Sequence, residues 1–282
     1  MDNKFLGLEL LETGMLPVLM FLAILFVVKF GWFFGNKAHH DSDGKRTKSD
    51  DTLIGAVLGL MGLIIAFTFS GAAGRLDQRE RLIVNEANTI STAYSSISYL
   101  DSSDRPEVVG LFKKYLDERI NLYTNVLEED FVNKQNKAES LLNEIRDTAL
   151  SKLSNVKPAD RALANDLIRQ ISAISSAYDA QRQAMFFHPP KIIWISLFLL
   201  VIASSFLAGY KMGIEQRKER FLLFVFALLM ASAVYLILSL EFPLLTHVNM
   251  SQYDQEFVRL RNAIPESQST SILGVASDVV GN

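Results

Sequence analysis

Four apolar stretches of about twenty residues alternate with polar sequence along the chain, and they cover 15–34, 53–73, 192–210 and 221–240. A helix needs roughly 20 residues to cross the ~30 Å hydrocarbon core of a bilayer. No water-soluble packing needs four such stretches. The pattern therefore predicts an all-α integral membrane protein with four transmembrane helices, and the lipid bilayer is its first expected partner.

The second apolar stretch continues into polar sequence without a proline. It begins at the helix-capping residues Asp50, Asp51 and Thr52 and reaches Tyr99. At about 1.5 Å per residue, one helix over 50–99 would be ~75 Å long, roughly twice the hydrocarbon thickness. Half of it is therefore expected outside the membrane. A heptad spacing there predicts a coiled-coil-like contact, with Leu76, Ile83, Ile90 and Ile97 at one position and Ala87 and Tyr94 at the other.

The polar sequence between the second and third spans carries apolar residues at helical spacing. It predicts soluble helices over 107–130, over 136–156 and from Pro158 to Phe187. Pro189 and Pro190 then break the helix before the third span, and His188 beside them is interpreted as an interface residue rather than a proton relay.

These elements define four expected segments. A first transmembrane pair with an N-terminal lead-in occupies 1–71, and a soluble helical bundle that continues span two occupies 72–190. A second transmembrane pair follows over 191–241. The remaining 242–282 offers one short helix, over 252–263, and a Ser-rich tail. The bundle is thus inserted between spans two and three.

Small residues follow one face of the second span. They recur at steps of three or four, which places them on one side of a helix, where they would let another helix approach closely in lipid. We expect a tight helix contact here, and the alternative is a pore lining. The opposite face carries Thr68 and Arg75. The small residues are Gly55, Gly59, Gly62, Ala66 and Ser70, followed by Ala73.

Composition agrees with a membrane protein and limits its chemistry. The 282 residues are 49% hydrophobic and only 21% charged, with a mean hydropathy of +0.19. The chain has no cysteine, which rules out disulfides and thiolate metal sites. A net charge of −3 gives no reason to expect nucleic acid as a partner. The first 13 residues hold one lysine and three acids, and the apolar run that follows has full spanning length with no small-residue cleavage pattern near its end, so we expect a retained first span.

The sequence carries no recognisable catalytic signature. It contains no phosphate-binding Gly-x-x-x-x-Gly-Lys, no His-Glu-x-x-His and no Gly-x-Ser-x-Gly. His39, His40, Asp41 and Asp43 lie together in the first connector, but adjacent histidines point apart and the surrounding sequence is typical of a linker. We therefore expect no enzyme activity, no cofactor and no metal site.

The distribution of basic residues gives an expected orientation. The two short connectors, 36–52 and 211–220, hold four lysines or arginines each, whereas the N-terminal tail holds one and the C-terminal tail two. The positive-inside rule then places both connectors in the cytoplasm and the termini and bundle outside. Arg75, Arg79 and Arg81 oppose this assignment, because they crowd the other end of the second span.

The chain resembles a family of bacterial four-span membrane proteins described as bestrophin-like. The resemblance rests on the run 66–75, on 86–90 and on Glu241-Phe242-Pro243 at the end of the fourth span, although the usual glycine after that proline is missing. Further matching positions are Asp77, Arg79, Leu82, Thr92, Ala93, Tyr94, Tyr115 and Arg119.

The resemblance implies kinship with bestrophins, which are oligomeric anion channels, and a multi-pass location in the bacterial inner (plasma) membrane. Bestrophins keep both termini in the cytoplasm, which conflicts with the orientation expected from the basic residues.

Two hypotheses for function follow. The first is a homo-oligomeric ion channel, with anions favoured by rings of arginine; its self-association and a small inorganic ion are then the expected partners. The second is a structural or signalling membrane protein whose bundle binds a partner without transport. The candidate pore or ion contacts are Thr68, Arg75, Arg79, Phe67 and Phe69. The candidate packing or partner contacts are Asp77, Glu86, Asn88 and Tyr94.

An alternative interpretation leaves Arg75, Arg79 and Arg81 as markers of the lipid headgroup boundary. A transporter ranks lower than either hypothesis, because intramembrane acids and broken helices at the bilayer midplane are not visible in the sequence.

Overall fold

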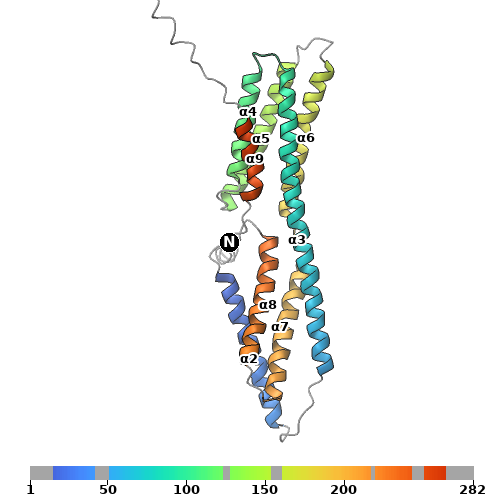
Figure 1. The fold of residues 1–282 in the computed structure, drawn as a ribbon, viewed down its shortest axis with the longest axis vertical. Helices are drawn as coiled ribbons and strands as arrows, with labels where there is room; N and C mark the ends of the chain where they lie inside the picture. Colours follow the sequence, from blue (N-terminus) through green and yellow to red (C-terminus); the bar gives the residue numbers. More distant parts are fainter. Residues whose placement is uncertain are drawn as a thin grey trace, which may run out of the picture. The chain divides into compact units, whose positions relative to one another are not determined.

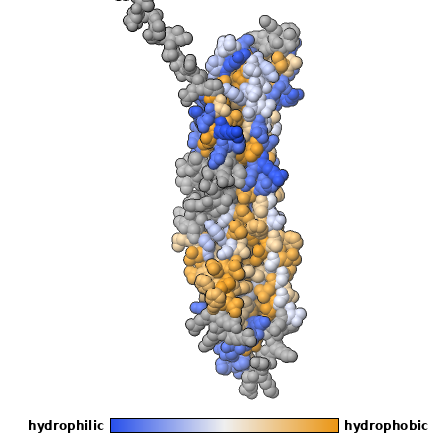
Figure 2. Space-filling model, in the orientation of Figure 1, coloured by the Kyte–Doolittle hydropathy of each residue, from blue (hydrophilic) through white to orange (hydrophobic). Residues whose placement is uncertain are grey.

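The computed structural model describes residues 15–41, 51–122, 128–153, 161–216, 220–242 and 251–264, and the regular structure in these ranges is helical. Within these ranges, four helices are long and apolar enough to cross a membrane, as predicted. They are α2 (Met15–Asp41), the apolar part of α3 (Asp51–Ser96), α7 (Lys191–Ile214) and α8 (Arg220–Glu241) (Figure 1). Figure 2 shows the hydrophobic residues gathered over this group.

The remaining helices are polar. They are the short 3₁₀ helix η1 (Ile97–Tyr99), α4 (Arg105–Asn121), α5 (Glu128–Leu153), α6 (Arg161–Phe186) and α9 (Ser251–Ala263). The predicted long helix is present as α3, and the predicted tail helix is present as α9. The all-helical prediction is confirmed.

The chain divides into two compact units, and α3 contributes residues to both. The first unit, called here the membrane unit, combines Met1–Arg79 with Phe186–Asn249. The second, called the bundle unit, combines Glu80–Met185 with Met250–Asn282. The division on α3 therefore falls at Arg79, some residues beyond the segment boundary expected at 71.

One expected helix is interrupted. The sequence predicts a single helix over 107–130, but α4 ends at Asn121 and α5 already begins at Glu128. The apolar spacing used for the prediction runs on through Tyr123 and Leu127, which lie outside the described residues. Periodicity cannot distinguish one long helix from two helices whose stripes happen to stay in phase.

Helices α2 and α7 approach each other very closely in the membrane unit. A Cβ atom added at Gly31 would lie 2.2 Å from the backbone oxygen of Phe206, and one at Gly209 would lie 2.0 Å from that of Val28. Gly35 and Gly213 lie one turn further along the two helices. Backbone-to-backbone packing of this kind requires small residues on both helices. The tightest contact in this unit is therefore between spans one and three.

The small-residue face of α3 is uncovered within the chain. Apart from the neighbouring backbone of α3 itself, no heavy atom of the described residues lies within 4 Å of a Cβ built at Gly55, Gly59 or Gly62. Ala66 and Ser70 on the same face are exposed as well. Among the described residues, no helix covers the three glycines, so the tight helix contact expected for these five residues stays a prediction.

Most of the predicted heptad residues form part of the core of the bundle unit, whereas Leu76 is half-buried in the membrane unit. Ile83, Ile90 and Ile97 are buried, as is Ala87. The ring of Tyr94 lies 6.4 Å from that of Phe112 on α4, and Ser96 donates a hydrogen bond of 2.7 Å to Gln170 on α6. The predicted seam thus packs against the helices of its own unit.

Candidate functional site

Glu241, the last residue of α8, is a fully buried carboxylate in the membrane unit. Arg75 donates to its Oε2 through Nε at 2.8 Å, and Nη2 of Arg75 lies 2.7 Å from the same oxygen. His188 places Nδ1 2.9 Å from Oε1. Arg79 donates through Nη1 to the backbone oxygen of Glu241 at 2.9 Å and through Nη2 to that of Phe187 at 3.3 Å. We call Glu241, Arg75, Arg79 and His188 the Glu241 cluster.

The Glu241 cluster joins three segments of the membrane unit. Arg75 and Arg79 are four residues apart, so they leave the same face of α3 toward the end of α8. His188 comes from the link between α6 and α7, and its ring lies 4.8 Å from that of Phe242. A buried carboxylate is stable only when charged or polar groups surround it, and here Arg75 donates to it while Arg79 Nη2 lies 3.7 Å and His188 Nδ1 2.9 Å from Oε1.

This arrangement changes the interpretation of the arginines. The sequence offers Arg75 and Arg79 as a selectivity ring or as headgroup markers, and the structure engages both with an acid of the same chain. The cluster is not apparent in the sequence, because Glu241 is 166 residues from Arg75 along the chain. One signal was available, since an acid directly after a long apolar span needs a partner or water.

Thr68 also faces inward. Its side chain is buried, and its hydroxyl donates to the backbone oxygen of Ile64 at 2.7 Å, a local bond typical of threonine in helices. Phe67 and Phe69 are exposed, at 66% and 40%. The five candidate pore residues therefore divide into three that point into the chain and two that point out of it.

The uncovered face of α3 changes character along the helix. Successive α-helical residues are about 100° apart, so positions three or four apart stay on one side. Up to Ser70 the exposed positions on this side are the small residues from Gly55 to Ser70, together with Phe69. Further along they include the polar Asp77, Asn88, Ser91 and Ser95 and the apolar Val84. This side of α3 carries no packed neighbour in the described chain over the three glycines tested.

A second buried charge cluster lies in the bundle unit. Arg119 on α4 donates from Nε to Oε1 of Glu86 at 2.7 Å and from Nη2 to Oε2 at 2.6 Å, and both side chains are 0% exposed. The hydroxyl of Tyr115 donates to Oε1 at 2.6 Å. This bidentate pair is the strongest geometry available to an arginine and a carboxylate.

Aromatic rings cover the guanidinium of Arg119. Its central carbon lies 5.2 Å from the ring centre of Tyr178 on α6 and 5.1 Å from that of Phe257 on α9. Burial and the neighbouring Glu86 carboxylate raise the pKa of Tyr115 well above its ordinary value, so this phenol stays protonated and keeps donating. The cluster thus connects α3, α4, α6 and α9.

The sequence named Glu86, Tyr115 and Arg119 separately, and the structure brings them together. Asp77 and Asn88, predicted with Glu86 and Tyr94 as packing or partner contacts, are exposed, so their role as partner contacts stays a prediction. The signal that could have paired Glu86 with Arg119 is their position. Each charged residue falls within an apolar stripe, Glu86 between Ile83 and Ile90 and Arg119 after Phe112 and Tyr115.

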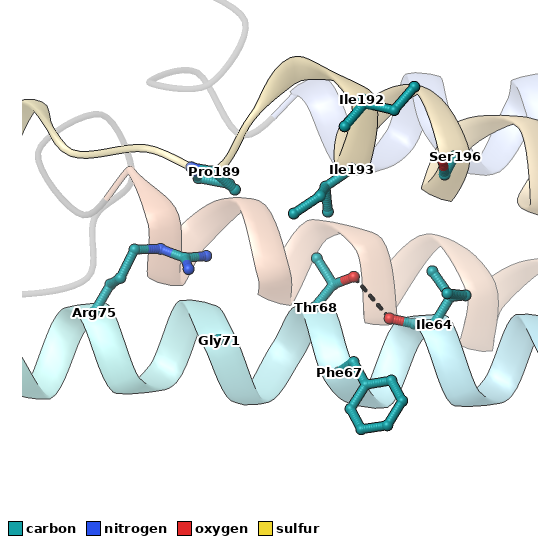
Figure 3. A pocket seen from close by; sticks show the side chains of 9 residues that line it. All are labelled: Ile64, Phe67, Thr68, Gly71, Arg75, Pro189, Ile192, Ile193 and Ser196. Carbon is teal, nitrogen blue, oxygen red and sulfur yellow. Dashed lines mark hydrogen bonds between the residues drawn. The ribbon is translucent and has the colours of Figure 1, made fainter.

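A groove of about 360 Å³ lies between α3 and the start of α7 in the membrane unit (Figure 3). Its walls are mostly apolar, and Arg75 lies at one end. Figure 3 shows the guanidinium of Arg75 above Gly71 and beneath Pro189. The lining residues are Ile64, Phe67, Thr68, Gly71, Arg75, Pro189, Ile192, Ile193 and Ser196.

Within the described residues, His, Asp and Glu side chains form no group of three or more that could hold a metal ion. His39 and His40 lie at the end of α2 with ring centres 6.1 Å apart and planes at 78°. Asp43 lies outside the described residues.

Comparison with known proteins gives one family and a common fold. The model of the Bestrophin-like domain family matches residues 21–248. Two crystal structures of variants of a bacterial bestrophin homologue from Klebsiella pneumoniae align at 12% and 10% identity, with TM-scores of 0.63 and 0.58. They cover 88% and 86% of this chain and 98% of their own. A crystal structure described as a membrane protein aligns at 10% identity with a TM-score of 0.59, covering 87% and 98%. Comparison with curated proteins gives no match.

Proposed function

The chain belongs to the Bestrophin-like domain family, and from this premise we propose that it is a subunit of a homo-oligomeric ion channel in which α3 of each copy lines the path. The supporting observation is the division of α3 into two sides. One side is held by the Glu241 cluster, and the other is small, uncovered and free of charge from Gly55 to Ser70.

Several copies arranged around an axis would bring these uncovered sides together. Small residues leave room for a passage between closely packed helices, and the exposed Phe69 is placed to narrow it as an apolar constriction. Beyond the span, exposed Asn88, Ser91 and Ser95 would continue the path with uncharged polar groups. Oligomerisation in the bacterial inner membrane is part of this proposal.

The selectivity follows from which charges line this side. Arg75 and Arg79 are engaged by Glu241, on the side of α3 opposite to the uncovered one. Their charges would therefore act on a passing ion only from the far side of the helix. Asp77 and Arg81 are the first exposed charged residues after the apolar part of α3. The anion preference that kinship with bestrophins suggests would then depend on Arg81 rather than on a ring of Arg75.

Flux from liposomes tests the proposal. Purified full-length protein is reconstituted, and chloride and potassium efflux are followed separately. Ala66→Glu and Ala66→Arg place opposite charges on the uncovered side and should shift the chloride-to-potassium ratio in opposite directions. Ile195→Glu and Ile195→Arg, at an exposed position of α7, are the matched controls and should leave the ratio unchanged. Absence of flux for both ions would refute the channel.

A second candidate function is a membrane protein whose bundle unit binds a partner without transport. The observation that favours it is an open hollow in the bundle unit lined by Asn88, Thr89, Thr92, Gln170 and Ala173. Under this hypothesis, Asn88→Arg would abolish cross-linking to a defined partner protein, while liposomes carrying the wild-type protein would pass neither ion.

A further inference from the structure

We infer that the groove between α3 and α7 binds an anionic phospholipid, with the phosphate on Arg75 and one acyl chain along the apolar walls. Arg75 sits where the apolar part of α3 gives way to charged sequence, which is the level of lipid headgroups. The groove extends from there to Ile64, eleven residues or about 16 Å deeper along the helix.

The guanidinium of Arg75 has one donor nitrogen, Nη1, that Glu241 does not engage. Nε and Nη2 are used on Glu241, and no acceptor in the described chain takes Nη1. A Cβ built at Gly71 would lie 3.3 Å from Nη1. Because Gly71 lines the groove, this nitrogen lies next to the groove. Because Gly71 has no side chain, Nη1 is left open to the groove (Figure 3).

Charge favours an anion at this end. The carboxylate of Glu241 is shared among Arg75, Arg79 and His188, so it neutralises the Arg75 guanidinium only in part. The Arg75 side chain keeps 19% exposure, which leaves it accessible. A guanidinium edge matches the oxygens of a phosphate group, and hydrogen bonds between charged partners are about twice as strong as neutral ones.

The rest of the groove suits an acyl chain. Ile64, Ile192 and Ile193 supply apolar walls, and Phe67 flanks them on α3. Ile192 and Phe67 are each 66% exposed. A bound acyl chain would therefore remove these side chains from contact with bulk lipid rather than from water. In a membrane this contact contributes shape complementarity but no hydrophobic driving force. Selectivity between lipids must therefore come from the headgroup.

Binding of defined lipids to the full-length protein in detergent tests the inference. Native mass spectrometry measures retention of dioleoylphosphatidylglycerol, which is anionic, against dioleoylphosphatidylcholine, which is zwitterionic. Both headgroups carry the phosphate, so the two lipids differ in the choline cation, which would bring a like charge close to Arg75 and Arg79. We expect about tenfold tighter binding of the anionic lipid or more. Equal retention of the two lipids would overturn the inference. Full displacement of the anionic lipid by inorganic phosphate would overturn it too, because the site would then take a free anion.

Variants locate the site. Ile193→Trp fills the groove without touching the Glu241 cluster and should reduce retention of phosphatidylglycerol about tenfold. Ile195→Trp, an exposed position of α7 outside the groove lining, should retain it at the wild-type level. Should Ile193→Trp misfold, Ser196→Leu blocks the deeper end instead. Retention of phosphatidylglycerol at the wild-type level in a folded groove variant would refute the inference. A changed oligomer size without loss of lipid would also refute it, because the groove would then serve contacts between copies.

Discussion

Replacing Arg119 by methionine should severely destabilise the bundle unit. The change keeps much of the side-chain volume but leaves the carboxylate of Glu86 buried, with Tyr115 as its remaining donor from the cluster. Breaking a buried ion pair by removing one partner costs about 3–5 kcal/mol, because the other charge stays out of water. Loss of the ring contacts to Tyr178 and Phe257 acts in the same direction.

Native-state hydrogen exchange on the full-length protein measures this cost. A loss of 3–5 kcal/mol corresponds to roughly 10²–10⁴-fold faster exchange of the protected amides of α4 and of the second half of α3. The double variant Glu86→Leu with Arg119→Met removes both charges, so it should exchange more slowly than Arg119→Met alone.

The control is a surface ion pair of the same unit. Arg182 and Glu139 are 40% and 49% exposed and lie 2.9 Å apart, so Arg182→Met should change the exchange free energy by less than about 1 kcal/mol. If Arg119→Met behaved like Arg182→Met, the buried pair would contribute no more than a surface contact and the reasoning above would be refuted.

Three further predictions concern pH, the Glu241 cluster and the glycine contact. Burial raises the pKa of Tyr115, so its contribution to stability is present below its unfolded pKa of about 10 and is lost as pH rises beyond that. In thermal melts, the melting temperature of Tyr115→Phe should therefore fall less steeply at alkaline pH than that of the wild type. An unchanged slope would contradict this. Glu241→Gln should destabilise the membrane unit by about 2 kcal/mol or more in the same melts, because it removes the buried charge. His188→Ala removes a partner that is 37% exposed and should cost under about 1 kcal/mol. Equal effects of the two variants would contradict the assignment of Glu241 as the centre of the Glu241 cluster. Gly209→Ala should lower the melting temperature because its Cβ would overlap the backbone of α2, while Gly110→Ala, which meets no atom within 4 Å, should raise it slightly; a rise in both would argue against the close helix approach.

The periodicity of the sequence was sufficient for the helices but not for their partners. Span length and the 3.6-residue repeat predict α2, α3, α7 and α8, because each depends on residues close together in the chain. The GxxxG spacing exists in three places, at Gly55 and Gly59, at Gly31 and Gly35, and at Gly209 and Gly213. Only three-dimensional packing reveals that the last two pairs face each other and that the first meets no other helix among the described residues.

The two charge clusters were less accessible to sequence reasoning. Arg119 and Glu86 are 33 residues apart, and Arg75 and Glu241 are 166 apart. No local rule pairs residues at such separations, because the pairing depends on how whole helices pack. What the sequence does provide is the anomaly itself, a charge within an apolar stripe or at the end of an apolar span, since such a charge requires a partner.

The division of α3 into two sides explains why a helix so apolar carries arginines at all. If Arg75 and Arg79 faced the uncovered side, closely packed copies would bring like charges together and repel one another. With both arginines bound to Glu241, each copy neutralises much of that charge internally, and the small side remains open for contact with other copies. The Glu241 cluster therefore stands as a precondition of the proposed assembly: a variant that frees these arginines should impair oligomerisation before it alters ion flux.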